Sequence, residues 1–453
     1  MKYFYFFILL IVTLLVLACP NPSFSGGSEF EQIPDNGSGG NVSASPLFIT
    51  EWEITVAGTS ITLPLGYRRS TVYEDVSYDF TVDWGDGSTP VHIRESTDLA
   101  RTHEYAVPGV YQLKISGICE AWDFGEIPDS REYVTAVRSW GAAPEFGGFK
   151  RLSFEGCNNL QALAAGGIKG SASSFYQSFY KCEKLAIIPE DLFIFCTGAT
   201  NFVTVFSRTA ITEIPPALFR YTVAARDFSV AFEYCSRLAS IPEELFSDTT
   251  QATDMSRVFN NCHALVSIPA DLFKSVSEVT SFVAAFEDCT GLTELPQDLF
   301  RYNSNVNNFF GVFRNCDKLK SIPQDFFKYN SEASNFSNAF FYCEELETIP
   351  SGLFRFNTNA ENFDRCFMGC FSLIMQPDIF YVDGEQLSRF AGQSVSFEEF
   401  LFRDAYYGPA SGGTAPDLWA CTGTFTSEFC FGGFGNSSIS LSNYNSISAR
   451  WLD

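Results

Sequence analysis

The sequence predicts a mixed fold, in which an all-β sandwich is followed by an α/β solenoid of about nine 27-residue units and a C-terminal cap. Two observations lead to this expectation. One phrase containing phenylalanine, cysteine and leucine recurs at a fixed period through the second half of the chain, and short apolar runs broken by Gly, Pro and Asp precede it. Fixed repeats of this length are typical of solenoids, whereas alternating short runs indicate half-buried strands.

The amino-acid composition limits the kinds of partner that the protein can bind. The chain has 453 residues, of which 29 are basic and 53 acidic, so its formal net charge is -24. The resulting field repels phosphate backbones and anionic lipid headgroups, and we expect no nucleic-acid partner. The length suits one repeat array with an attached module.

Residues 1–18 are typical of an export signal, because Lys2 precedes an unbroken apolar run that is too short for a membrane span. The end of this run, Val16-Leu17-Ala18-Cys19, resembles the lipobox of bacterial lipoproteins. This resemblance implies a lipid anchor on Cys19 that holds the protein to a membrane. An ordinary secretory signal or an uncleaved anchor helix is the alternative. Residues 19–46, rich in Gly, Ser, Asn and Pro, predict a flexible tether.

Residues 47–118 alternate in polarity and predict the β-sandwich. The sequences "DFTVDWGDGS" and "THEYAVPGVYQLKIS" resemble the PKD-type immunoglobulin-like domain, and the matching residues are Trp84, Gly85, Asp86, Gly87, His103, Tyr105, Pro108, Gly109 and Tyr111. Asp83 and Asp86 are too few for the six to eight oxygens that Ca²⁺ takes, so a structural turn is the better interpretation. Residues 119–150 have no clear pattern and are interpreted as a junction.

The repeats cover residues 151–380 and share a cysteine slot, occupied by Cys157, Cys182, Cys235, Cys262, Cys289, Cys316, Cys343 and Cys370, with Thr209 in a shorter copy. Phe282, Phe286 and Cys289 are spaced i, i+4, i+7, which predicts a helix with one buried face. The segment "CHALVSIP" predicts a brief strand. The proline and acid of "IPADLF" predict the first turn of a second short helix.

The slot cysteines are interpreted as small buried packing residues. Disulfides between neighbouring slots remain an alternative in an exported protein, and Cys421 with Cys430 is the better candidate pair. A zinc string is disfavoured because zinc sites need two cysteines a few residues apart, and among the slots only Cys370 has such a neighbour, Cys366.

The pattern in "AFEYCSRLASI", "AFEDCTGLTEL" and "AFFYCEELETI" resembles the BspA-like leucine-rich repeats of bacterial surface proteins. The resemblance covers about half the chain and implies a leucine-rich-repeat solenoid, although the common repeat of that family is shorter than 27 residues. Residues 381–453, where the period fades, are interpreted as the cap that covers the last apolar face.

No enzyme motif is found. His92, His103 and His263 are the three histidines, and none stands in a metalloprotease string; the nucleophile-elbow, P-loop and dinucleotide motifs are absent. We therefore expect no catalytic residues, no cofactor and no metal.

The combination of export signal, tether, β-module and repeats predicts a binding protein, anchored by lipid at the outer surface of the bacterial cell envelope, that adheres to or recognises a protein or glycan ligand. Candidate contacts are Ser240, Ser267, Glu294, Ser321 and Thr348, and a second row of Tyr221, Tyr302 and Tyr329. Both rows are equally compatible with plain solvent-facing positions. Two alternatives stay open: a structural envelope protein, and an accessory lipoprotein that presents glycans to a separate enzyme.

Overall fold

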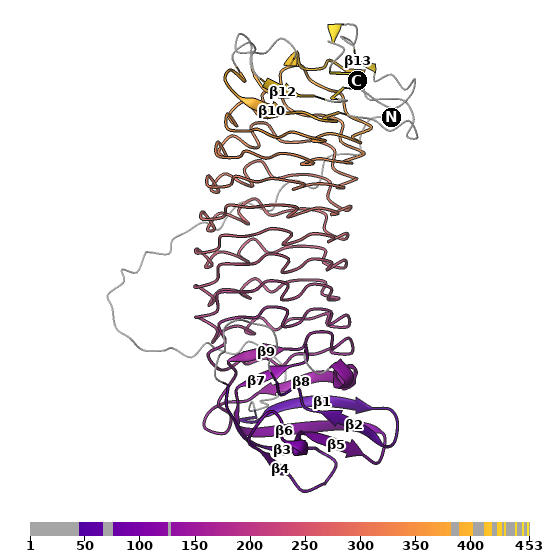
Figure 1. The fold of residues 1–453 in the computed structure, drawn as a ribbon, viewed down its shortest axis with the longest axis vertical. Coiled ribbons are helices and arrows are strands. Elements are labelled where there is room, and N and C mark those ends of the chain that lie inside the picture. Colours follow the sequence, from indigo (N-terminus) through magenta and orange to yellow (C-terminus); the bar gives the residue numbers. More distant parts are fainter. Residues whose placement is uncertain are drawn as a thin grey trace, which may run out of the picture. The chain divides into compact units, whose positions relative to one another are not determined.

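The structure is a computed structural model of the chain (Figure 1). It describes residues 45–66, 76–125, 128–381 and 389–401, and six short pieces near the C-terminus: 412–418, 424–427, 430–431, 440–441, 446–447 and 451–452. Residues 44–453 form one compact unit. The predicted signal peptide and nearly all of the predicted tether lie outside the described residues.

The first part of this unit is a β-module. Its main sheet is antiparallel, with the strand order β4-β3-β6-β1-β8. These strands are β1 (Phe48–Ile54), β3 (Tyr78–Asp83), β4 (Val91–Ile93), β6 (Gly109–Cys119) and β8 (Val134–Trp140). A separate antiparallel ribbon pairs β2 (Thr59–Thr62) with β5 (Thr102–Tyr105), and two short 3₁₀ helices complete the module, η1 (Leu99–Arg101) and η2 (Pro128–Tyr133).

Alternation of polarity explains the strands of the main sheet. In β3 the side chains of Tyr78, Phe80 and Val82 are buried, while the residues between them are not. Successive side chains of a strand point to opposite faces, so this pattern places one face of the sheet on the core. The expected sandwich of two facing sheets is replaced by this five-stranded sheet and the small ribbon.

The segment interpreted as a junction joins the β-module to the repeats by hydrogen bonds. Its strand β8 pairs with β1 at the edge of the main sheet, and the Val137 N–H donates to the Ala162 carbonyl of the first repeat at 2.9 Å. The strand β7 (Ala121–Asp123) pairs in parallel with β9 (Arg151–Ser153). One continuous cluster of buried apolar side chains runs from Phe48 to Trp451. The β-module therefore closes one end of the repeat core.

Residues 151–380 form a stack of irregular coils, one per repeat, which we call the coil stack (Figure 1). Neighbouring coils are joined by backbone hydrogen bonds. The N–H groups of Phe282, Ala284 and Phe286 donate to carbonyls of the next coil at 3.1, 2.7 and 3.0 Å. Parallel bridges join equivalent residues of successive coils from Ser174 to Ser396. Each coil thus pairs its backbone groups both in turns of its own and with the neighbouring coils.

The predicted α/β leucine-rich-repeat solenoid is wrong. Residues 151–380 contain no α-helix, and β9 is their only strand longer than an isolated bridge. The predicted helix through Phe282 and Phe286 is a pair of tight turns, in which the Ala285 N–H donates to the Phe282 carbonyl at 3.1 Å. The "CHALVSIP" segment is a turn at His263 and Ala264 followed by irregular backbone rather than a strand, and "IPADLF" forms a turn from Ala270 rather than a helix.

The helix prediction was wrong because the apolar residues of these segments recur about every four positions. Consecutive four-residue turns return a side chain to the same side of the chain, as a helix does, so the spacing of Phe282, Phe286 and Cys289 fits both structures. The backbone distinguishes them, because Ala284 and Asp288 have φ values of 53° and 59°, in the left-handed region. Apolar spacing alone carries no information about that dihedral.

Three ladders of phenylalanine rings fill the coil stack. One ladder consists of Phe179, Phe206, Phe232, Phe259, Phe286, Phe313, Phe340 and Phe367, with stacked neighbours whose ring centroids are 5.4 to 5.7 Å apart. Every ring in this ladder is fully buried. Because burying one such side chain stabilises a fold by about 1.5–3 kcal/mol, the ladders explain why the repeats are rich in phenylalanine.

The C-terminal part continues the core over its last coil. Phe397 stacks on Phe363 at 5.2 Å, and the buried Trp451 lies 6.0 Å from Phe397. The short strands there pair in parallel, β10 (Ser394–Ser396) with β12 (Thr424–Thr426) and β11 (Gly412–Gly413) with β13 (Ser440–Leu441). Apolar rings thus cover the exposed end of the phenylalanine ladders.

Candidate functional site

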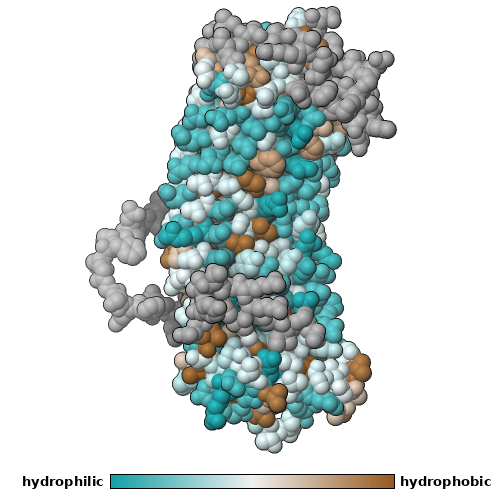
Figure 2. Space-filling view, viewed as in Figure 1, coloured by the Kyte–Doolittle hydropathy of each residue, from teal (hydrophilic) through white to brown (hydrophobic). Residues whose placement is uncertain are grey.

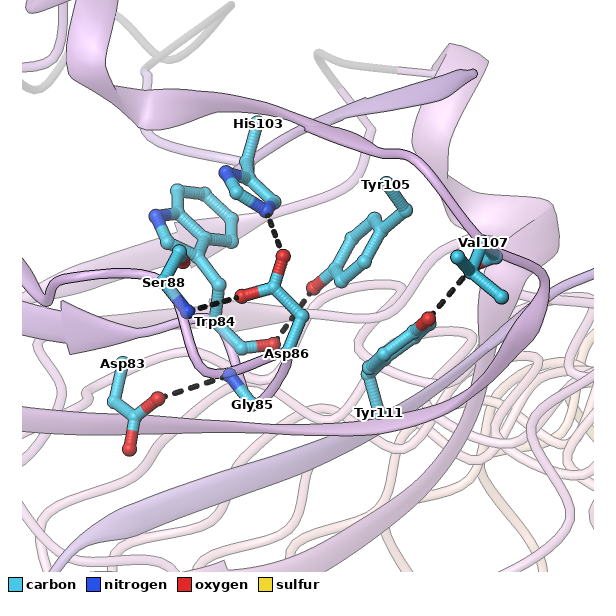
Figure 3. Close-up of polar contacts among 9 residues, drawn as sticks. All are labelled: Asp83, Trp84, Gly85, Asp86, Ser88, His103, Tyr105, Val107 and Tyr111. Carbon is cyan, nitrogen blue, oxygen red and sulfur yellow. Dashed lines mark hydrogen bonds and ion pairs between the residues drawn. The ribbon is translucent and has the colours of Figure 1, made fainter. Parts of the chain in front are cut away.

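The residues that carry the PKD resemblance lie together at one turn of the β-module (Figure 3). The Asp86 carboxylate accepts a hydrogen bond from the Ser88 N–H at 3.0 Å and contacts His103 Nε2 at 2.7 Å. The imidazole of His103 stacks on Trp84, with ring centroids 4.8 Å apart. The Tyr105 hydroxyl donates to the Trp84 carbonyl at 2.9 Å. These contacts fix the turn from both sides.

Gly85 shows why this turn needs glycine. Its φ is +80°, and a Cβ built there would lie 2.6 Å from the carbonyl oxygen of Gln112. The Asp83 carboxylate accepts a hydrogen bond from the Gly85 N–H at 2.9 Å. Both aspartates are therefore engaged in the turn itself, and no group of three or more metal-ligating side chains is found among the described residues.

The charge of Asp86 is stabilised by its neighbours. Burial alone would raise the pKa of this carboxyl, but hydrogen bonds from Ser88 and His103 outweigh that effect and lower its pKa to about 2. Asp86 is thus ionised at neutral pH. A carboxylate in this state accepts hydrogen bonds and holds a turn, and it does not serve as a proton donor.

The eight slot cysteines form one column through the coil stack. All are buried free thiols: Cys157, Cys182, Cys235, Cys262, Cys289, Cys316, Cys343 and Cys370. Seven of them donate S–H hydrogen bonds to a phenylalanine carbonyl of the preceding repeat, at 3.1 to 3.4 Å. Cysteine therefore contributes a weak donor as well as its small volume. Cys430 is also a buried free thiol, and its suggested partner Cys421 lies outside the described residues.

The slot cysteines have raised thiol pKa values. Burial raises the pKa of Cys235 to about 12, with a smaller opposing effect of hydrogen bonds with Thr209. Burial also raises the pKa of the Cys289 thiol. Since the thiolate is the reactive form, these cysteines are poor nucleophiles and poor metal ligands at neutral pH.

The first candidate row lies on the surface as one column. Its members are all exposed: Ser240, Ser267, Glu294, Ser321 and Thr348. A parallel bridge joins Ser321 to Thr348, and Thr348 to Ile374 in the coil that follows. Short polar side chains thus follow one another from coil to coil, and Figure 2 shows a mostly polar surface along one face of the stack.

The tyrosine row is divided. Tyr302 and Tyr329 occupy neighbouring coils and are 40% and 38% exposed. Tyr221 is 37% exposed but lies three coils away, with Asp248 and Ser275 at the intervening positions. Only Tyr302 and Tyr329 can therefore contact one small ligand together.

A row of cations beside the tyrosines was not predicted. Lys274, Arg301, Lys328 and Arg355 follow the buried Leu-Phe or Phe-Phe pair in four successive coils. The Arg301 guanidinium lies 5.6 Å from the ring of Tyr302 and 5.5 Å from that of Tyr329. The signal was present in the sequence as a basic residue at a constant 27-residue spacing.

The predicted lipid attachment residue, Cys19, lies outside the described residues, so the structure does not place it. Within the described part of the chain, no helix has the length and apolar character required to cross a membrane.

No protein-family model matches this sequence, and a search of curated proteins finds no significant match. The resemblances to PKD-type domains and to BspA-like repeats stay predictions.

Proposed function

We propose that this protein is a binding protein of the bacterial cell envelope, held at the outer surface by lipid on Cys19, that recognises a protein or glycan through exposed rows of its coil stack. The observation that carries the proposal is the repetition of surface side chains in register. The serine-rich row from Ser240 to Thr348 and the pair Tyr302 and Tyr329 each recur at consecutive coils.

The framework beneath these rows supports recognition. The phenylalanine ladders and the cysteine column are buried, and each coil is hydrogen bonded to its neighbours. Side chains on such a framework are held at fixed spacing before a ligand arrives, which reduces the entropy lost on binding. Stacked repeats use extended surfaces of this kind for binding.

Protease treatment of intact cells tests the location. We expect a protease added outside to cut the coil stack while periplasmic and cytoplasmic marker proteins remain intact. Cys19→Ala is the companion variant, and it should move the protein from the membrane fraction to the soluble fraction, because the acyl chains supply the membrane affinity. A coil stack that stays protected until the envelope is broken would contradict surface recognition.

Substitution tests the serine-rich row. Ser267→Arg and Ser321→Arg together place two large charges on the row without touching the core, so the fold should be retained. We expect cell adhesion or binding to immobilised ligand to fall at least about tenfold if the row is the contact surface. Equal adhesion by a folded variant would remove the row from the proposal.

A further inference from the structure

The row of cations interleaves with the exposed Tyr302 and Tyr329 and the half-buried Phe356 into one surface feature. We call it the cation–aromatic stripe: Lys274, Arg301, Lys328, Arg355, Tyr302, Tyr329 and Phe356. The contacts alternate along the stack. Lys274 lies 5.9 Å from the ring of Tyr302, and Lys328 lies 5.6 Å from that of Tyr329 and 5.8 Å from that of Phe356. Four consecutive coils contribute to it.

The stripe is unusual in a chain of net charge -24. No other position in residues 151–380 carries a cation in four successive coils. Like charges placed directly opposite each other on neighbouring strands destabilise a sheet, and the same repulsion acts between adjacent coils. Four cations in register give this line of the surface a local positive charge that favours an anionic ligand.

The acidic neighbours of the stripe do not cancel it. Lys274 pairs with Asp271 at 3.0 Å and Arg301 with Asp298 at 3.7 Å, but the side chains of both pairs are about half exposed. Exposed ion pairs contribute only about 0–1 kcal/mol. A ligand carboxylate can therefore replace these partners at small cost, while the pairs hold the cations in position when no ligand is bound.

The aromatic rings of the stripe favour a ligand with flat apolar faces in addition to negative charge. Tyr302 and Tyr329 expose 40% and 38% of their surface beside the cations, whereas Asp248 and Ser275 occupy the same position in the two preceding coils. Exposed aromatic rings offer a flat apolar face with a polar edge. The C–H face of a pyranose ring packs on such a surface, whereas an extended acidic peptide has no regular flat face to offer.

We propose that the cation–aromatic stripe binds a linear polysaccharide that contains uronic acids, with its axis along the coil stack. Each carboxylate lies at a lysine or arginine, and the intervening sugar faces pack on Tyr302 and Tyr329. This inference rests on the proposed function and names its ligand class. Coils that stack at the spacing of neighbouring β-strands, about 5 Å, repeat at close to the length of one sugar ring.

The extent of the stripe sets a length requirement. Its N-terminal end lies at Lys274, since Ser247 and Asp248 occupy the equivalent positions of the coil before. Linked contacts reinforce one another only where one ligand reaches them together. Affinity should therefore rise with chain length up to an oligosaccharide that spans four coils and then level off.

The test is titration calorimetry of the full-length protein in mild detergent against oligogalacturonates of increasing length. Three folded variants are compared: Arg301→Gln with Lys328→Gln, Tyr302→Ala with Tyr329→Ala, and a control with equal charge change at exposed cations elsewhere, Lys184→Gln with Arg226→Gln. We expect at least a tenfold loss of affinity for the first variant, a smaller loss for the second, and less than a twofold change for the control. Thermal unfolding verifies that each variant is folded.

Two further probes separate the ligand classes. Polyglutamate carries carboxylates without sugar rings, and single-stranded DNA carries phosphates. Binding of either one as tightly as the oligogalacturonates would overturn the inference, as would equal affinities in the first variant and the control. If the stripe binds oligogalacturonates but the coil stack is protected in intact cells, the proposed surface location fails and the inference stands. If adhesion occurs at the surface and stripe variants bind normally, only the inference fails.

Discussion

At the scale of single residues, each coil contains residues with a strained, left-handed backbone. Non-glycine residues adopt positive φ four positions apart, such as Thr204 and Arg208, both at 60°. Left-handed conformations cost about 1–2 kcal/mol for most residues. The cost is offset because these turns direct N–H groups to the next coil, as in the bond from the Thr204 N–H to the Ser229 carbonyl at 3.1 Å. The strain is thus a local consequence of stacking.

Val230 tests this strain directly, because it is β-branched and has a φ of 63°. Val230→Gly should leave stability unchanged or raise it by up to about 1 kcal/mol, since glycine tolerates this dihedral. Val283, also half-buried, precedes the left-handed position of its coil and does not have a positive φ. Val283→Gly should lower the free energy of unfolding by about 1 kcal/mol. Urea denaturation measures both, and equal losses would contradict the assigned turns.

Asp86 predicts a pH dependence. Its pKa in the folded protein is about 2, below the ordinary 3.8, so its carboxylate stabilises the fold above that ordinary value, and this contribution is lost as the pH falls through about 2. Asp86→Asn should cost about 1 kcal/mol at pH 7, a modest value because the site is partly solvated. The difference between wild type and variant should shrink between pH 4 and pH 2 in thermal unfolding. A constant difference would exclude the charge as its cause.

At residue scale the sequence was informative where glycine and aspartate define a turn. The resemblance brought Trp84, Asp86, His103 and Tyr105 into one list, and the structure brings them into contact. The left-handed residues of the coils could not be predicted. Thr204, Val230 and Ala284 are not residues that favour positive φ, and only the hydrogen bonds to the next coil make that conformation stable.

At the scale of one coil, buried amides add a second set of bonds between repeats. Asn303, Asn330 and Asn357 are fully buried at equivalent positions. The Asn330 Nδ2 donates to the carbonyls of Phe300 and Asn303 at 3.1 and 2.9 Å, and Asn357 repeats the pattern one coil later. Arg389 donates to the Phe354 and Asn357 carbonyls in the same way and ends this asparagine ladder.

The asparagine ladder should contribute measurably to the free energy of unfolding. Asn330→Ala removes two buried hydrogen bonds and leaves two carbonyls without that donor, so it should cost about 2–4 kcal/mol. Asn305→Ala is the matched control, because its Nδ2 also donates to a carbonyl of the preceding coil, that of Ser277 at 3.2 Å, but on the exposed surface. The control should cost less than about 0.5 kcal/mol. Similar costs in denaturant unfolding would contradict the ladder's role.

At this scale the repeat period was predictable and the secondary structure was not. The recurrence of Phe, Cys and Leu places equivalent residues one above another, and the ring ladders follow that register. The helix prediction failed because a spacing of four residues suits tandem turns as well as helices. Each N–H group can donate to the carbonyl of residue i-4, as in a helix, or to a carbonyl of the next coil. Tertiary packing decides between the two, and apolar spacing does not encode it.

At the scale of the molecule, the described residues form one continuous core in which the β-module closes one end of the coil stack and C-terminal rings cover the other. Rows in register on this core are the basis for the proposed binding surface and for the cation–aromatic stripe. The predicted border between module and repeats is bridged by hydrogen bonds, because the sheet edge at β8 needs a partner and the first coil supplies it.

Both proposed binding surfaces depend on the register of adjacent coils, and a designed disulfide tests that register. Asp288 and Asn315 are equivalent residues of adjacent coils, with Asn315 Nδ2 2.8 Å from the Asp288 carboxylate. Asp288→Cys with Asn315→Cys should form a disulfide under mild oxidation, identified by non-reducing peptide mapping, because adjacent coils lie about 5 Å apart. Helices packed side by side would separate the two positions by about 8–10 Å. Absence of the bond in a folded protein would contradict the stacked coils.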